Sequence, residues 1–458
     1  MTKREERQDK KLLIIGGGAV GMAVSTGATR HGNHEVTVIS SDKYVSYSQC
    51  GIPYVFSGEI PNFEQLIVRD LEFFQEMGIK LRLGTQVDSI DLTNNTISIE
   101  EEQLAFDKLV IATGSKAYIP RNIETGTSLK NVFTLRTLSD GMHIAEALKN
   151  AKNVVIIGAG SIGSEVAIAA ARRGIRTSLL SRSNTILSSS LDPDMAEMVI
   201  SYLEREGIQV LTEHTPESLN GDDKITSVTA NGREIPADVV LISVGVAPDT
   251  SLALEAGIDI GAVGGIVTNN KLQVVADGNV IENVFAGGEC TQIYNFVTGK
   301  PMLSHLASTA RRMAGVITDN LDNKDTKFNP VVNPWVAVIG DLQIGSVGVT
   351  TKEAEKQGMR VISGIATGST NAEYFPGGGK IFIKVLFYNR CLVGAQIIST
   401  TGTKERIDGL SLAIKRKQTI DELLEMETCY SPAVSTLQDP LLFAVKGAYK
   451  KMPKKDAL

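Results

Sequence analysis

The apolar positions of the chain form two similar stretches, in which a short continuous apolar run enters a glycine-rich segment. Lys11–Ile15 leads into Gly16–Gly21, and Asn153–Ile157 leads into Gly158–Gly163. A run of small residues follows each glycine-rich segment. A continuous apolar run is typical of a strand buried on both faces, so each stretch predicts a strand, a tight turn and a helix.

Further apolar runs follow each glycine-rich segment. The first is followed by runs at 35–40 and 109–114, and the second by runs at 176–181 and 239–245. Strands that alternate with helices in this way build parallel sheets. We therefore predict an α/β fold with two doubly wound Rossmann-like nucleotide-binding domains.

The order of the elements changes at about residue 330. Short apolar runs predict four strands, at 335–339, 344–349, 380–387 and 392–398. Helical patterns follow them at 403–417, 419–426 and 432–448. Strands followed by helices indicate a separate α+β C-terminal domain.

Composition and charge exclude several classes of protein. The 458 residues are 42% hydrophobic and carry a net charge of −6, which argues against nucleic acid or an anionic membrane as the main partner. The N-terminus lacks an apolar signal segment, and the apolar run from 12 to 24 is too short to span a bilayer. The four cysteines, at 50, 290, 391 and 429, include no close pair. We expect free thiols, no metal site and a cytoplasmic protein.

Each glycine-rich segment matches a dinucleotide fingerprint, in which the phosphates lie at the N-terminus of the helix. The residue that ends the second strand selects between a ribose hydroxyl and a 2′-phosphate. In the second unit Ser181 replaces the usual acid and Arg182 follows it, which favours NADPH, although NADH stays open. In the first unit the same position is Ser40, with Asp42 two residues later.

Cys50 is the candidate for chemistry. It precedes Gly51-Ile52-Pro53, and proline suits the first turn of a helix. A thiol at a helix N-terminus has a lowered pKa, so we expect a reactive thiolate. The alternative is an inert structural cysteine.

These motifs together resemble the single-cysteine branch of the pyridine nucleotide-disulfide oxidoreductases. Within that branch the chain is most similar to coenzyme A-disulfide reductases and to related NAD(P)H oxidases and polysulfide reductases. The matching segments are Gly16–Gly21, Tyr47–Tyr54, Ala112–Gly114, Gly158–Gly163, Val284–Glu289, Tyr374–Gly377, Gly394–Gln396, Arg406–Asp408 and Tyr430–Pro432.

The resemblance implies FAD in the first unit, NAD(P)H in the second and a C-terminal domain that forms a homodimer. It implies that hydride passes from nicotinamide through flavin to Cys50, which forms a mixed disulfide with the substrate. Tyr430 and Tyr374 would reach the Cys50 of the other subunit, and Arg312 would approach the phosphates of coenzyme A. The implied domains are 1–118 and 246–329 for FAD, 119–245 for NAD(P)H and 330–458 for dimerisation. The implied cofactor-binding residues are Gly16, Gly18, Ala19, Gly21, Ser40, Ala112, Thr113, Gly114, Gly158, Gly160, Gly163, Ser181, Arg182, Gly245, Gly288 and Glu289.

The chain departs from the family pattern at three positions. Ser40 replaces the acid that binds the FAD ribose, and Glu289 replaces the aspartate that binds the ribityl chain. Ala19 stands where peroxidases and oxidases of this branch carry a histidine, which argues against peroxidase chemistry. Cys429, beside Tyr430, is either a small packing residue or a second thiol that resolves an oxidised Cys50.

Three functions are consistent with these residues. The first is a reductase of CoA-disulfide or of a related disulfide, persulfide or polysulfide. The second is an NAD(P)H oxidase that reduces O₂ while Cys50 cycles through a sulfenate. The third is a flavoprotein redox sensor or electron-transfer partner, for which the sequence offers no dedicated partner surface.

Overall fold

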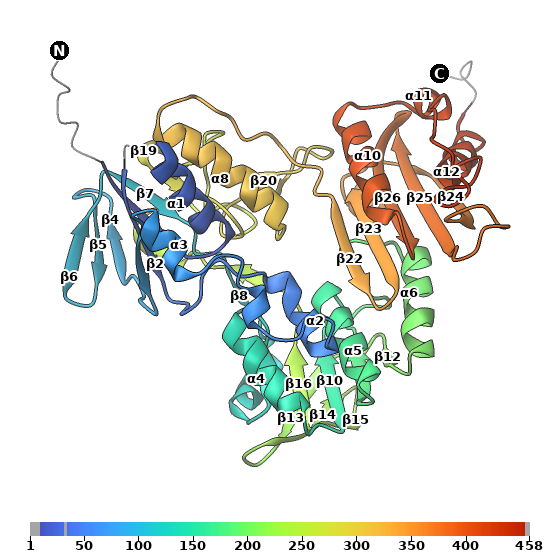
Figure 1. The fold of residues 1–458 in the computed structure, drawn as a ribbon, viewed down its shortest axis with the longest axis horizontal. Helices are drawn as coiled ribbons and strands as arrows, with labels where there is room; N and C mark the ends of the chain where they lie inside the picture. Colours follow the sequence, from blue (N-terminus) through green and yellow to red (C-terminus); the bar gives the residue numbers. More distant parts are fainter. Residues whose placement is uncertain (1–9, 32–33, 454–458) are drawn as a thin grey trace.

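The computed structural model describes residues 10–31 and 34–453. The predictions for the first nine residues and the last five lie outside these ranges. Figure 1 shows three lobes, two of which contain the glycine-rich turns, while the C-terminal residues form the third.

The first lobe contains a six-stranded sheet that draws on two distant parts of the chain. Its order is β18-β19-β7-β1-β2-β3, and β1 pairs in parallel with both β2 and β7. The strands are β1 (Lys10–Ile15), β2 (His34–Ser40), β3 (Lys80–Leu83), β7 (Lys108–Ile111), β18 (Gln273–Ala276) and β19 (Asn279–Ala286). The apolar run at 109–114 therefore ends as a strand at Ile111, three residues before Gly114.

Two helices, α1 (Ala19–His31) and α8 (Ala307–Leu321), lie side by side against this sheet (Figure 1). Gly27 permits their contact, because a Cβ at this position would lie 2.8 Å from the side chain of Thr318. Val20, Met313 and Ile317 are buried in the same apolar cluster. The glycine-rich turn is thus held between a buried strand and a buried helix.

The second lobe contains a five-stranded parallel sheet of order β12-β11-β10-β16-β9. Its strands are β9 (Val132–Thr134), β10 (Asn153–Ile157), β11 (Arg176–Leu180), β12 (Gln209–Leu211) and β16 (Val239–Ile242). Three helices accompany it, α4 (Leu138–Leu148), α5 (Ser161–Arg172) and α6 (Pro193–Arg205). The prediction of two Rossmann-like sheets is confirmed, although the edge strand β18 of the first sheet pairs antiparallel with β19.

Two three-stranded antiparallel sheets were not predicted. One consists of β4 (Ser89–Asp91), β5 (Thr96–Ile99) and β6 (Glu102–Ala105). The other consists of β13 (Pro216–Gly221), β14 (Ile225–Ala230) and β15 (Arg233–Pro236). Their strands are short and rich in polar residues, so their apolar pattern is weak.

The C-terminal lobe is an antiparallel sheet of order β22-β23-β26-β25-β24 with helices against it. Its elements are β22 (Trp335–Ile339), β23 (Leu342–Gly348), α9 (Thr351–Lys356), β24 (Ile362–Ser369), β25 (Lys380–Tyr388), β26 (Cys391–Ser399), α10 (Thr403–Lys415), α11 (Ile420–Leu424) and α12 (Pro440–Tyr449). The helix predicted from residue 432 begins only at Pro440, where the side chain of Asp439 caps it. Strand β24 was missed.

A buried lysine joins the C-terminal lobe to the second lobe. Lys384 on β25 lies 2.9 Å from Asp192 and 2.8 Å from Asp194, at the start of α6. Asp192 also accepts hydrogen bonds from the backbone N–H and the hydroxyl of Thr351, at 2.9 and 2.6 Å. A buried ion pair is satisfied only when every partner is in place, so this cluster fixes how the two lobes meet.

Candidate active site

The two glycine-rich turns have open space where phosphates would lie. A Cβ on Gly18 or on Gly160 would have no neighbour within 4 Å. Gly16 and Gly158 have φ of +112° and +111°, which glycine adopts readily. A Cβ on Gly21 or on Gly163 would collide with the carbonyl oxygen of the first glycine of its turn, so the helix needs glycine to approach the strand so closely.

The residues that follow the second strand, β2 or β11, differ between the two nucleotide-binding units. Ser181 is buried, and its hydroxyl donates to the carbonyl of Thr185 at 2.7 Å. Arg182 is exposed and has no hydrogen bond or ion pair among the described residues. Ser183 also donates to Thr185, at 2.8 Å. An unpaired guanidinium beside small hydroxyl residues suits a phosphate group.

Ser40 and Asp42 occupy the matching place in the first unit. Ser40 is buried, and its hydroxyl accepts from the backbone of Asp42 at 3.3 Å. Asp42 itself accepts from the backbone of Tyr44 at 3.0 Å and from the hydroxyl of Tyr47 at 2.7 Å. Both oxygens of the Asp42 carboxylate therefore accept hydrogen bonds from its own loop. Asp42 does not take the place of the acid that usually ends this strand. The Ser40 hydroxyl is the group left for a ribose.

Cys50 lies in a 3₁₀ turn, Gln49–Gly51, directly before the short helix α2 (Ile52–Ser57). Pro53 occupies the first turn of that helix, as predicted. The preceding segment has Ser46 in the left-handed region, with φ of +56°, and pairs with 66–68 through backbone hydrogen bonds of Ser48 and Val68. A non-glycine residue held in this conformation is often found near functional sites.

The expectation of a lowered pKa at Cys50 is wrong for this chain. Desolvation by burial raises the pKa of the thiol, and the charges of Glu165 and Glu289 raise it further. Cys50 precedes the first residues of α2, a helix of only six residues, so the helix dipole offers little compensation. The thiol is nonetheless exposed to solvent in the single subunit.

An ion-pair network beside Cys50 was missed by sequence reasoning. The guanidinium of Arg136 lies 2.6 Å from Glu289 and donates to the hydroxyl of Ser115 at 2.7 Å. Ser115 donates to Glu289, and His305 lies 3.5 Å from the other carboxylate oxygen. Burial opposes ionisation of Glu289, but the hydrogen bond from His305 and the charge of Arg136 lower its pKa to about 2.

The same arginine holds the cysteine loop. The backbone carbonyl of Arg136 accepts from the side-chain amide of Gln49 at 2.8 Å. Its backbone N–H donates to Asp140, which forms a capping box with Thr137 at the start of α4. Arg136 therefore links the residue before Cys50 to Glu289. It follows a short strand and belongs to no motif, so no sequence signal marked it.

Tyr374 and Tyr430 are brought together on the C-terminal lobe. Their hydroxyl oxygens lie 3.0 Å apart, and the side chains are 76% and 45% exposed. The hydrogen bond with Tyr374 raises the pKa of Tyr430. The backbone N–H of Ala372 donates to the carbonyl of Pro432 at 3.1 Å, which ties the two loops together. Two phenols so exposed are available to a second protein chain.

The remaining predicted residues lie around the two units. Ala112 donates its backbone N–H to Ile15, and the hydroxyl of Thr113 donates to the carbonyl of Asp249 at 2.6 Å. Gly114, Gly245 and Gly288 all have φ between +72° and +122°. Ala19 begins α1.

Arg312 and Cys429 lie away from these turns in the chain and are both exposed. The guanidinium of Arg312 on α8 stacks on the ring of Phe328, with 5.2 Å from Cζ to the ring centroid. The carbonyl of Cys429 accepts a hydrogen bond from Ser435. The roles predicted for both residues stay predictions.

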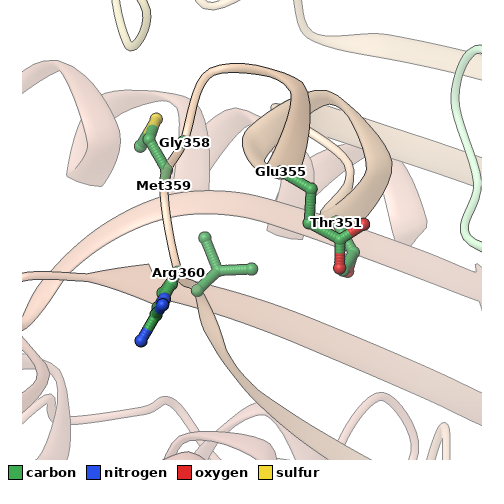
Figure 2. A pocket seen from close by; sticks show the side chains of 6 residues that line it. Thr351, Glu355, Gly358, Met359 and Arg360 are labelled. Carbon is green, nitrogen blue, oxygen red and sulfur yellow. The ribbon is translucent and has the colours of Figure 1, made fainter.

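All four cysteines are free thiols. Across residues 10–31 and 34–453, no group of three or more His, Cys, Asp or Glu side chains could hold a metal ion. In the same ranges, no helix combines the length and the apolar character needed to cross a bilayer. A hollow of about 520 Å³ lies beside α9 and the turn into β24 (Figure 2). It contains none of the predicted site residues, so it is not the site.

The first unit fits FAD. The turn leaves space in front of Gly18, and Ser40 ends β2, the strand whose last residue faces the ribose in a dinucleotide fingerprint. The buried Nε of Arg136 has no hydrogen-bond partner, which is expected of a donor that faces a cofactor. The charge of Glu289 acts on the Cys50 thiol, and Gln49, next to Cys50, bonds to Arg136, the partner of Glu289, so the two residues lie in the same region of the first unit.

Two nucleotide-binding sheets, a thiol beside the first and an exposed phenol pair define the class of flavin- and nicotinamide-dependent oxidoreductases. The model of the family described as pyridine nucleotide-disulphide oxidoreductase matches residues 10–314, and its dimerisation domain matches residues 334–439. The chain belongs to this family, which uses FAD and NAD(P)H.

The two relatives found by sequence are matched over nearly their whole length. An NADH oxidase of Methanocaldococcus jannaschii is 36% identical, over 97% of this chain and 100% of the relative. A CoA-dependent NAD(P)H sulfur oxidoreductase of Pyrococcus furiosus is 32% identical, over 95% of this chain and 98% of the relative. The solved NAD-dependent persulfide reductase of A. fulgidus superposes with a TM-score of 0.92 at 30% identity, over 96% of this chain and 83% of that chain.

Proposed function

We propose that this chain is an FAD-dependent reductase that passes hydride from NAD(P)H through flavin to Cys50, which reduces CoA-disulfide or a related disulfide, persulfide or polysulfide. The observation that carries the proposal is the environment of Cys50. The thiol is exposed, unpaired and joined through Gln49 and Arg136 to Glu289 of the first unit. With no disulfide partner in the chain, the second sulfur is supplied by the substrate.

In this proposal the cofactor, the ion-pair network and the thiol have separate roles. FAD, when bound, supplies the two-electron relay between nicotinamide and sulfur. Arg136 and Ser115 hold Glu289 ionised for the ribityl chain, and Gln49 fixes the loop that presents Cys50. The Cys50 thiolate attacks the disulfide, and a phenol of Tyr430 or Tyr374 from the partner subunit donates a proton to the leaving thiolate.

The test is turnover of the purified holoprotein with CoA-disulfide, polysulfide and O₂, in the wild type and in Cys50→Ser. We expect the variant to lose disulfide reduction by about 100-fold or more while NAD(P)H still reduces the flavin. Cys391→Ser is the matched control, because Cys391 is half-buried on β26. Unchanged disulfide turnover in Cys50→Ser would refute the proposal.

The second candidate is an NAD(P)H oxidase, and the name of the 36% identical relative from Methanocaldococcus jannaschii favours it. Ala19 argues against it, because no imidazole stands at the start of α1 to assist peroxide chemistry. The same assay separates the two. O₂ consumption faster than disulfide reduction would favour the oxidase.

We further propose NADPH as the preferred nicotinamide cofactor. Ser181 carries no charge to repel a 2′-phosphate, and Arg182 is exposed and unpaired among the described residues. The ratio of kcat/KM for NADPH and NADH tests this, and a ratio that favours NADH would overturn it.

We propose that the protein works as a homodimer in a reducing compartment such as the cytoplasm. The match to a dimerisation domain and the exposed phenol pair support the dimer, and the four free thiols support the compartment. A mixture of Cys50→Ser and Tyr430→Phe subunits tests the dimer, because each mixed dimer leaves one site with both wild-type groups only if they come from different subunits. Recovery of activity above either variant alone would support that arrangement. No recovery would contradict it, since a site built within one subunit would always contain one altered group.

A further inference from the structure

One loop joins the ribose end of the second nucleotide-binding unit to the C-terminal lobe. This loop, residues 181–192, connects β11 to α6. Its first two residues, Ser181 and Arg182, stand where a dinucleotide fingerprint meets the ribose. Its last residue, Asp192, belongs to the Lys384 cluster of the C-terminal lobe. A displacement at one end of the loop can therefore reach the other.

The loop begins with a turn that closes on Thr185. The hydroxyls of Ser181 and Ser183 both donate to the carbonyl of Thr185, at 2.7 and 2.8 Å. Thr185 is buried, whereas Arg182 is exposed. The position of Thr185 therefore decides where the two serine hydroxyls, and the arginine between them, lie.

Leu187 fixes the middle of the loop to the glycine-rich turn. Its backbone N–H donates at 2.8 Å to the carbonyl of Ala159, which lies between Gly158 and Gly160. Leu187 is buried and has φ of +51°, in the left-handed region. A residue other than glycine keeps this conformation only where its surroundings hold it. The shape of the loop therefore depends on what packs against it.

The C-terminal lobe supplies part of those surroundings. Helix α6, which follows the loop, lies beside this lobe (Figure 1). Strands β22, β23 and β26 each contribute one isoleucine to the apolar cluster that contains the buried side chains of the loop. The loop residues and the isoleucines are Ile186, Leu187, Leu191, Ile339, Ile344 and Ile398. The loop is thus buried partly by a lobe other than its own.

The polar groups of Asp192 complete the attachment. Its backbone N–H donates to the side-chain oxygen of Gln396 at 2.8 Å, and its carboxylate is bound by Thr351 and Lys384. An aspartate directly before a helix usually accepts from the first turn of that helix. Among the described residues, the Asp192 side chain makes no such bond to α6. Its carboxylate serves the C-terminal lobe instead, and the buried Lys384 is the cation that pairs with it.

We propose that Lys384 is a positioning residue for the nicotinamide nucleotide. By pairing with Asp192 and Asp194 it holds the 181–192 loop against the glycine-rich turn, so that the C-terminal lobe sets the affinity of the second unit for NAD(P)H. Lys384 acts through the loop and not on the reacting atoms. The inference goes beyond the proposed function, because it holds whichever sulfur compound, or O₂, accepts the electrons.

The test is the anaerobic reduction of bound FAD by NADPH, and separately by NADH, in the holoprotein without a disulfide substrate. Stopped-flow traces at increasing nucleotide concentration give the Kd and the limiting rate separately. We expect Lys384→Met to raise the Kd by at least about fivefold, the lower end of coupling between distant sites, and to leave the limiting rate within about twofold. A role in stability alone would lower the Tm and leave the Kd unchanged.

Lys404→Met is the matched control. Lys404 is paired with Asp408 on α10 of the same lobe, and both side chains are exposed. Its replacement therefore removes an ion pair from the C-terminal lobe without touching the 181–192 loop. A Kd in Lys384→Met no higher than in this control would overturn the proposal.

If Lys384→Met does not fold, hydrogen exchange of the wild-type holoprotein decides. The backbone N–H of Thr351 donates to Asp192 at 2.9 Å, so a nucleotide bound to the second unit should slow exchange at Thr351 as well as at the glycine-rich turn. Slower exchange at the turn alone, with NADP⁺ or NAD⁺ added, would overturn the proposal. Neither measurement uses disulfide turnover, so failure of the proposed function is recognised separately.

Discussion

The two nucleotide-binding units form nearly the same turn. Gly16 and Gly158 differ by 1° in φ, at +112° and +111°. The N–H of Gly16 donates to Ile39 at 2.8 Å, and the N–H of Gly158 donates to Leu180 at 2.9 Å. The units differ at the end of the second strand. The carboxylate of Asp42 in the first unit accepts hydrogen bonds from its own loop, whereas Arg182 in the second unit has no hydrogen bond or ion pair in the part of the chain that the structure describes. The turn therefore holds phosphates in general, and the neighbouring side chains select the nucleotide.

Replacement of the third glycine by valine tests whether the turns act independently. In Gly163→Val the new Cβ would force α5 away from its strand, and such a displacement costs about 100-fold in kcat/KM for NAD(P)H. FAD should stay bound, as measured by flavin absorbance of the purified protein. Gly21→Val should instead lose FAD and melt at a lower temperature. Loss of both cofactors in both variants would show that the units do not act separately.

Arg182→Gln tests the difference between the units directly. A charge-assisted hydrogen bond contributes about 1.5–3 kcal/mol, so kcat/KM for NADPH should fall by about tenfold or more. The value for NADH should change little, because NADH has no 2′-phosphate. Arg233→Gln, an exposed arginine on β15 of the same lobe, is the control. An equal loss for both nucleotides in Arg182→Gln would contradict selection at this position.

Thermal melts between pH 5 and 9 compare one carboxyl from each unit. The lowered pKa of Glu289 means that its stabilisation is full above the unfolded value of about 4.5 and is lost as pH falls toward about 2. The raised pKa of Glu165 means that its stabilisation is full below about 4.5 and is lost as pH rises through about 8.

Glu165→Gln should therefore raise Tm relative to the wild type at pH 9 and have little effect at pH 5. Glu289→Gln should lower Tm across the whole range. A Tm difference for Glu165→Gln that does not vary with pH would contradict the assignment.

The smallest expected effect concerns the first unit. Asp42→Asn removes the charged acceptor of Tyr47 but no group that faces the cofactor, so the Kd for FAD should stay within about twofold. Ser40→Ala removes the hydroxyl left for the ribose and should weaken FAD binding by about 1 kcal/mol. Titration of apoprotein with FAD, followed by quenching of flavin fluorescence, measures both. A weaker affinity in Asp42→Asn than in Ser40→Ala would reverse the assignment.

Local features of the sequence predicted most of the fold, and long-range contacts account for most of what it missed. The turns at Gly16 and Gly158 were predictable because strand, turn and helix are adjacent in the chain. Arg136 was not, because its partner Glu289 lies 153 residues away. Glu165 looks like a polar residue on an amphipathic helix until α2 covers it. The raised pKa of Cys50 depends first on burial and then on both carboxylates, so it could not be predicted from the sequence either.

The Lys384 cluster bears on how far this enzyme can be treated as modular. One buried cation on β25 holds two aspartates at the start of α6, and Thr351 completes the set. A chimera that replaced only the C-terminal segment with that of a relative could leave the two aspartates without the lysine that pairs with them. A chimera of this protein must therefore keep Lys384, Asp192, Asp194 and Thr351 together, whichever substrate it is designed to reduce.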